Sequence, residues 1–216
     1  MANPVPFVDE LHFASVKQLA NAIQDRRVRA ADVMQAYLDR IAAINPAINA
    51  VVLLAPDARE QARQSDADLD SGIVRGPLHG VPFSVVDIIG TANLTSELDR
   101  RIRRREPPRT DATVVARLRA AGAILLAKTN CPPAGRGRDT ENAITGRTLN
   151  PYQPQHTPGG GSGGEAALVA AGGSPLAWAA MQGVGCECPL ITAGWRRSSR
   201  LLAACPIRAS ITTLVG

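Results

Sequence analysis

A glycine-rich loop constrains this chain more than any other stretch. Residues 157–164 read TPGGGSGG, so that five glycines surround one serine, Ser162. Glycine lacks a Cβ, and the backbone here can therefore turn its N–H groups toward a ligand in conformations closed to other residues. The alanine-rich residues 165–172 (EAALVAAG) predict a helix directly behind the loop. The loop is expected at a helix N-terminus, where amides and the helix dipole favour negative charge.

Three interpretations of this loop compete. Gly159, Gly161 and Gly164 match G-x-G-x-x-G, but residues 150–154 (NPYQP) cannot form the apolar strand that a dinucleotide-binding fold places before it. No Lys-Ser or Lys-Thr pair follows, which excludes a phosphate-binding P-loop. A flexible linker stays open on composition alone. The third interpretation is a family resemblance that extends well beyond the loop.

Composition limits the class of protein. With 216 residues, 45% of them apolar, the chain can bury one substantial core. The net charge of +5 owes much to five arginines in residues 100–105, a short basic run typical of a solvated loop, so no nucleic-acid partner is expected. Neither a signal peptide nor a membrane span is expected. The four cysteines (Cys131, Cys186, Cys188 and Cys205) show no CxxC spacing, which predicts no metal site and a cytoplasmic location.

Local patterns predict alternating helices and strands. Ser15 begins a capping box before a first helix, and a second helix over residues 30–44 is expected to stop before Pro46. A short buried strand over residues 50–54 and a polar helix over residues 56–69 follow.

The next part of the chain predicts a parallel sheet. Residues 81–89, which include Val86, form an apolar run typical of a strand buried on both faces. Asp111 is expected to cap a helix that Gly122 ends, and residues 124–126 form another buried strand. This alternation is typical of an α/β layered fold.

A set of motifs in matching order resembles the amidase signature family over residues 10–176, most closely its fatty-acid-amide-hydrolase-like and general bacterial members. The motifs are residues 76–83 (GPLHGVPF), 111–123 (DATVVARLRAAGA), 128–130 (KTN), 146–148 (GRT), 150–152 (NPY) and the glycine loop. The resemblance implies a mixed sheet flanked by helices, with residues 1–176 as the N-terminal part of the domain. It also implies a small-molecule amide substrate and no cofactor. The oligomeric state stays open.

The resemblance implies hydrolysis of a carboxamide C–N bond by a Ser-cisSer-Lys triad. A lysine acts through a serine held in a cis peptide, and this serine relays the proton from a second, nucleophilic serine. A serine hydroxyl is a weak nucleophile at its own pKa and needs such a base within hydrogen-bond reach. Backbone amides beside the nucleophile would hold the oxyanion.

The chain departs from this pattern at all three catalytic positions. Val86 stands at the lysine position, Gly161 at the cis-serine position and Gly185 at the nucleophile position. The remaining glycine-loop positions, expected to face a substrate, are Gly159, Gly160, Ser162 and Gly163; those expected to form the oxyanion hole are Gln182, Gly183 and Val184. Valine and glycine can neither give nor take a proton, so the sequence predicts an inactive or severely impaired chain.

The other residues that could replace the catalytic triad are weak candidates. Ser162 with a neighbouring acid would forfeit most of the triad's rate enhancement. His79 and His156 could serve as bases, but loop histidines of this kind are more often solvated or engaged in turn hydrogen bonds.

The last part of the chain, residues 177–216, has an unusual composition. It holds both tryptophans and three of the four cysteines, and shows no sustained helical or strand period. Codons compatible with residues 177–182, read one base out of frame together with the adjoining bases of the codons on either side, give Gly-Leu-Gly-Ser-Asp-Ala-Gly. Those for residues 188–206 can give Pro-Ala-His-Tyr-Cys-Gly-Val-Ala-Ala-Leu-Lys-Pro-Thr-x-Gly-Arg-Val-Pro, which resembles the family's continuation. The sequence thus predicts a single-base deletion near Ala177, in the gene or in its sequencing, and a non-native tail.

The shift does not account for every departure. The shifted reading at Gly185 permits Gly, Arg or Trp but not Ser, and Val86 and Gly161 lie upstream in the unshifted frame. Two alternatives to an inactive amidase descendant therefore stay open: a non-catalytic amidase-like binding or scaffold module, and an active amidase whose sequence determination is defective.

Overall fold

The computed structural model describes residues 11–96 and 106–179. Its main sheet has four strands in the order β1-β3-β2-β6, where β2 runs parallel to both β3 and β6 and β1 runs antiparallel to β3. The strands are β1 (Val51–Leu54), β2 (Pro82–Val86), β3 (Ile124–Thr129) and β6 (Ala177–Trp178). The sheet is therefore mixed, as the resemblance implied, and its central strands β2 and β3 are buried along their whole length.

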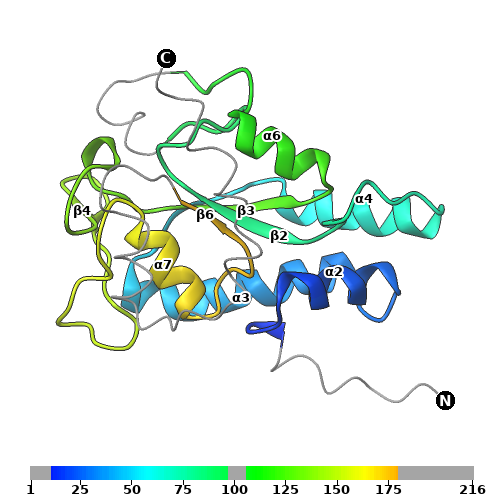
Figure 1. Cartoon of the computed structure of the whole chain (residues 1–216), viewed down its shortest axis with the longest axis horizontal. Coiled ribbons are helices and arrows are strands. Elements are labelled where there is room, and N and C mark those ends of the chain that lie inside the picture. Colours follow the sequence, from blue (N-terminus) through cyan, green and yellow to red (C-terminus); the bar gives the residue numbers. More distant parts are fainter. Residues whose placement is uncertain (1–10, 97–105, 180–216) are drawn as a thin grey trace, which may run out of the picture.

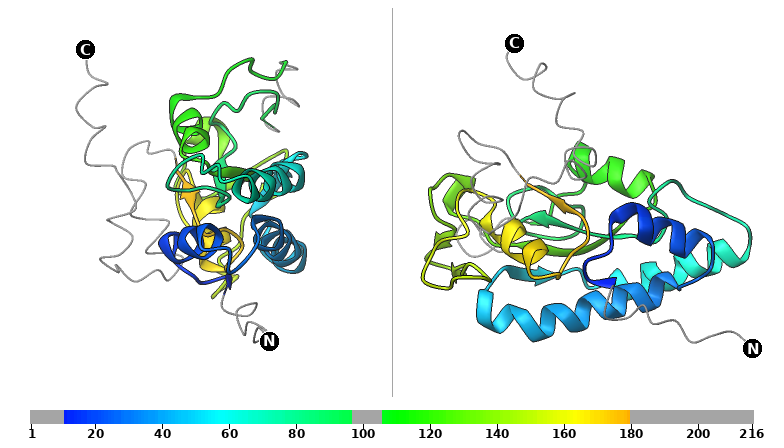
Figure 2. Two further views of the ribbon diagram at one scale, coloured as in Figure 1. Left: turned by 90° about the vertical axis from the view of Figure 1, so that its right-hand side faces the viewer. Right: turned by 60° about the horizontal axis from the view of Figure 1, so that its bottom comes forward.

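Helices cover both faces of this sheet. Figure 1 shows α6 on one side and α2, α3 and α7 on the other, and the right panel of Figure 2 shows α3 lying along one side of the molecule below α2 and α7. A further helix, α4, packs against α3 and β3. The helices are α2 (Val16–Gln24), α3 (Ala30–Ile48), α4 (Ala58–Asp70), α6 (Thr113–Ala120) and α7 (Gly163–Ala170). A short 3-10 turn η1 (Pro133–Gly135) and a small hairpin of β4 (Glu141–Asn142) and β5 (Gly146–Arg147) lie between β3 and α7.

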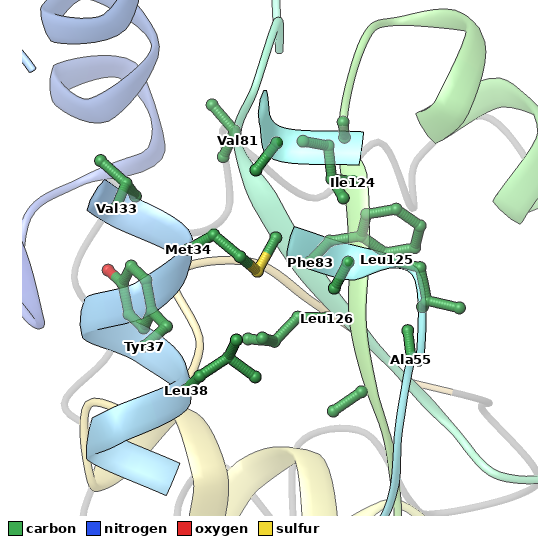
Figure 3. Packing of buried hydrophobic residues seen from close by; sticks show 14 of the residues in the cluster. Val33, Met34, Tyr37, Leu38, Ala55, Val81, Phe83, Ile124, Leu125 and Leu126 are labelled. Atoms are coloured by element: carbon green, nitrogen blue, oxygen red, sulfur yellow. The ribbon is translucent and has the colours of Figure 1, made fainter. Parts of the chain in front are cut away.

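The apolar core lies between α3 and the sheet. Figure 3 shows Met34 and Leu38 of α3 pointing toward the sheet, where Leu126 of β3 points back toward α3. Tyr37 is fully buried in the same layer, and its hydroxyl donates to the carbonyl oxygen of Leu11 at 2.7 Å. Burial raises the pKa of Tyr37, because the core cannot solvate a phenolate.

The first two helices begin in different ways. The predicted capping box at Ser15 is confirmed: its Oγ accepts the N–H of Gln18 at 3.3 Å, and Oε1 of Gln18 accepts the N–H of Ser15 at 2.9 Å. The start of α3 has no local cap. Instead, the carboxylate of Asp66 on α4 accepts the N–H groups of Ala30 at 2.7 Å and Ala31 at 3.0 Å.

The prediction that the second helix stops before Pro46 is wrong. Helix α3 continues to Ile48 and ends at Asn49, which adopts the left-handed conformation with φ of 48°. Proline costs little here because it lies in the last turn on the exposed side, where its missing N–H removes a single helical bond.

Asn45 of α3 holds the edge strand β1. Its Oδ1 accepts the N–H groups of Ala50 at 2.8 Å and Val51 at 2.7 Å, and its Nδ2 donates to the carbonyl oxygen of Val51 at 2.9 Å. Within β1 only Val51 is buried, and Leu54 is 42% exposed. The prediction of a short buried strand over residues 50–54 was therefore wrong in burial for its later residues, which lie at the edge of the sheet.

The predicted cap at Asp111 is also wrong. The N-cap of α6 is Ala112, and Asp111 accepts the N–H of Ala92 at 2.7 Å and forms an ion pair with Arg119 at 3.1 Å. Asp111 therefore ties a preceding loop to α6 through contacts that sequence spacing did not indicate.

Candidate active site

The lysine position lies at the end of β2, on the face of the sheet that α7 covers. Val86 is fully buried. Ser84, two residues earlier and hence on the same face, bonds to Glu165 of α7. A buried valine on this face cannot accept a proton, and the assignment of position 86 to the family's lysine stays a prediction.

The nearest lysine in the sheet points the other way. Lys128 of β3 precedes Thr129, whose hydroxyl reaches α7, so that Lys128 projects from the opposite face. Its Nζ donates to the carbonyl oxygen of Ile89 at 3.0 Å and lies 3.8 Å from Oδ1 of Asp87. Lys128 therefore does not provide a lysine on the face of the sheet that α7 covers.

The glycine loop precedes α7, as predicted, and Ser162 is the N-cap residue of that helix. Much of the loop is bonded within the protein. The N–H groups of Gly159, Gly160 and Gly163 donate to Oγ1 of Thr157, the carbonyl oxygen of Arg138 and Oγ1 of Thr140, respectively. Thr140 also donates to the carbonyl oxygen of Gly160 at 2.7 Å, so it fixes both sides of the loop. Ser162 is buried as well.

The cis-serine position has no room for a serine. A Cβ built on Gly161 would lie 2.1 Å from the carbonyl oxygen of Gly135, which belongs to η1. Real Cβ atoms do not approach a backbone oxygen so closely, and backbone cannot move aside as a flexible side chain can. The backbone around Gly161 is therefore packed for glycine, and the described residues contain no cis peptide bond.

Neither histidine offers a base at this site. His79 is fully buried: its Nδ1 accepts the N–H of Arg75 at 3.1 Å, so that Nε2 carries the proton and donates to the carbonyl oxygen of Ser65 at 2.9 Å. Nδ1 thus bonds within the turn and Nε2 bonds to helix α4, so His79 is hydrogen-bonded and not solvated. His156 is exposed in the loop before the glycines.

A buried polar cluster lies beside the lysine position. Oε2 of Glu165 accepts the hydroxyl of Ser84 at 2.6 Å, and Oε1 accepts the hydroxyl of Thr129 at 2.8 Å. The hydroxyl of Ser84 also lies 3.0 Å from that of Ser174. Burial away from water raises the pKa of Glu165 to about 8, although the two hydroxyl bonds oppose this shift. The acid nearest Ser162 in sequence is therefore already engaged with other side chains.

Sequence reasoning missed this cluster and the role of Thr140. One signal was available: Glu165 is the only charged residue between Gly159 and Gly173, and Ser84 is the only hydroxyl residue in the apolar strand β2. Polar residues in such apolar segments are commonly buried with a hydrogen-bond partner.

The predicted oxyanion positions Gln182, Gly183 and Val184 and the nucleophile position Gly185 lie outside the described residues. So does most of the predicted non-native tail, of which only residues 177–179 are described. Ala177 and Trp178 pair with Ser84 and Val85 through main-chain groups, which any sequence can provide, so the boundary at residue 177 stays a prediction. Among the described residues, no group of His, Cys, Asp or Glu could hold a metal ion, and no helix is both long and apolar enough to cross a membrane.

Comparison with known proteins identifies the chain's relatives. The Amidase family model matches residues 32–180. A glutamyl-tRNA(Gln) amidotransferase subunit of Acidothermus cellulolyticus is 43% identical over 161 residues, which cover 74% of this chain and 32% of that protein. The corresponding subunit of Thermobifida fusca is 41% identical over 169 residues, covering 78% and 34%. This chain spans about a third of the length of these curated relatives.

Solved structures agree. The native peptide amidase of Stenotrophomonas maltophilia superposes with a TM-score of 0.71 and 36% identity, covering 81% of this chain and 36% of that one. Fatty acid amide hydrolase superposes with a TM-score of 0.73 and 25% identity, covering 81% and 31%. Taken with the fold and the ordered motifs, these matches show that the chain belongs to the Amidase family, the amidase signature proteins.

Proposed function

We propose that this chain descends from enzymes that hydrolyse the C–N bond of small carboxamides, giving a carboxylic acid and ammonia or an amine, and that it has lost this activity. The observation that carries the proposal is the packing at Gly161, where the carbonyl of Gly135 occupies the space that a serine side chain would need. Val86 supports it, because an apolar side chain stands where the family's base would be.

The chemical argument concerns the proton. Attack by a serine hydroxyl on an amide needs a base that removes the hydroxyl proton and an acid that protonates the leaving nitrogen. On the α7 face of the sheet, the ionisable side chain that the structure describes beside Val86 is Glu165, and both its oxygens bond to hydroxyls in the interior. The relay would thus lack both its first and its second member.

Hydrolysis assays test this proposal. The purified chain is incubated with a panel of aliphatic, aromatic and peptide carboxamides, and ammonium release is followed by a coupled assay beside an active amidase. We expect no turnover above that of a heat-denatured sample. Turnover that disappears in the Ser162→Ala variant would contradict the proposal, because it would show that the single retained loop serine still acts.

A non-catalytic binding role is the second candidate. The curated relatives are named as subunits of a glutamyl-tRNA(Gln) amidotransferase, and such a protein can keep its place in a complex after its own chemistry is lost. Cooperative unfolding of a monodisperse chain, together with stoichiometric binding of one defined protein, would favour this role over that of a broken gene product. We also propose that the chain is located in the cytoplasm, as its cysteine pattern predicts.

The third candidate is an active amidase with a defective sequence determination. Resequencing the gene around codon 177 decides between a natural deletion and an error. A corrected reading that restores serine at the nucleophile position would still leave Val86 and Gly161 unexplained, since both precede the predicted shift.

A further inference from the structure

Position 86 and Glu165 lie against the same small region of the sheet. Val86 pairs directly with Thr129 across the parallel strands, and Ser84 precedes it by two residues on the same face. Glu165 accepts a hydrogen bond from each of these two neighbours, one on either oxygen. The side chain at position 86 is therefore flanked by both hydroxyls that hold the carboxyl, and a lysine there, with its four-carbon stem, would extend its ammonium group into this region.

The carboxyl of Glu165 has no cationic partner among the described residues. Its bonds come from neutral hydroxyls, and Ser174 extends the cluster with another neutral hydroxyl. Lys128, the nearest lysine in the sheet, projects from the opposite face and lies beside Asp87. An acid buried in this way normally has a charged partner, because burial of a single charge is costly.

We propose that Glu165 is a positioning residue for the lysine position: its carboxyl is built to hold the ammonium group of a lysine at position 86, and this chain retains one half of that pair. The inference rests on the proposed function, which assigns the family's base to position 86. It explains why an acid stands in an otherwise apolar helix, where it now bonds only to hydroxyls.

Restoring the lysine tests the pair. Four variants are compared with the unaltered chain: Val86→Lys, Val86→Met as a control of similar length without charge, Glu165→Gln, and Val86→Lys combined with Glu165→Gln. Glutamate labelled with ¹³C at Cδ reports the pKa of Glu165 by NMR, and the Glu165→Gln variant assigns its signal. An opposite charge within about 4–6 Å lowers a carboxyl pKa by about 1–3 pH units, so we expect a fall of that size in Val86→Lys and little change in Val86→Met.

A second measurement distinguishes an ion pair between the lysine at position 86 and Glu165 from a fold that merely accommodates the lysine. Urea midpoints at pH 7 should be lower in the combined variant than in Val86→Lys, because the combined variant leaves the lysine without its acid. Equal midpoints, an unchanged Glu165 pKa in Val86→Lys, or a Val86→Lys chain that is unfolded while Val86→Met folds would each overturn the pairing. None of these readouts needs hydrolysis. Failure of the pair is therefore distinguishable from failure of the proposed function, which only the ammonium-release assay decides.

Discussion

Replacing Glu165 with glutamine should remove most of the pH dependence of folding stability between pH 5 and pH 8. In the folded chain burial raises the pKa of Glu165 to about 8, whereas its ordinary value is 4.5. A carboxyl with a raised pKa binds its proton more tightly in the folded state than in the unfolded state. Its contribution to stability is therefore complete below about pH 4.5 and is lost as the pH rises through about 8.

The size of the effect follows from the two pKa values. Each pH unit between them corresponds to about 1.4 kcal/mol, which sets a ceiling of about 5 kcal/mol for the whole interval. Between pH 5 and pH 8 the free energy of unfolding of the unaltered chain should fall by about 3.5 kcal/mol through this group. That is a large share of the total stability of an ordinary domain, about 5–15 kcal/mol.

Urea unfolding followed by circular dichroism at pH 5, 6, 7 and 8 measures this fall. Glutamine keeps an oxygen that can accept from Ser84 or Thr129 but cannot ionise, so Glu165→Gln should be less sensitive to pH and more stable than the unaltered chain at pH 8. The exposed Glu60 gives a matched control, and Glu60→Gln should retain the original slope. If the unaltered chain and Glu165→Gln follow parallel lines across this pH range, Glu165 is not the buried acid that we describe.

Two further substitutions test the packing. Asp66→Ala should lower the free energy of unfolding by about 1–2 kcal/mol, since two N–H groups at the start of α3 lose their acceptor. Urea midpoints measure this loss, and Asp39→Ala on the exposed face of α3 is the control. Equal losses in the two variants would show that the cap is unimportant. Gly161→Ala should lower the free energy of unfolding by about 1–3 kcal/mol through overpacking against Gly135. Its control is Gly90→Ala, where the nearest atom to an added Cβ is Cγ of Pro108 at 3.8 Å, and a Gly161→Ala chain as stable as this control would refute the close approach.

The features that the sequence predicted correctly are those set by neighbouring residues. The capping box at Ser15 involves residues three apart, and the buried strand β2 follows from a local apolar run. The alanine-rich run placed a helix behind the glycine loop, and the family motifs placed Val86 at the end of a strand. Such short-range patterns can be recognised in the sequence because the interacting groups lie within a few positions of one another.

The features that it did not predict depend on contacts between distant residues. Glu165 bonds to Ser84, 81 positions away, and Asp66 caps a helix that begins 36 positions earlier. Pro46 predicted a helix end at residue 44 from local geometry alone, but α3 ends four residues later, at Ile48, where Asn49 is left-handed and Asn45 contacts β1. The close packing at Gly161 depends on where the fold places the carbonyl of Gly135, which the spacing of residues in the sequence does not indicate.

The contact between Asn45 and β1 has a consequence for association between molecules. A strand at the border of a sheet normally presents unpaired peptide groups, to which another polypeptide can add in the manner of amyloid. At Val51 both of these groups are already satisfied from within the same molecule. A strand that adds at Val51 would have to break these bonds before it could form its own, so a single asparagine gives this position protection that other proteins obtain from lysine, proline or a covering loop.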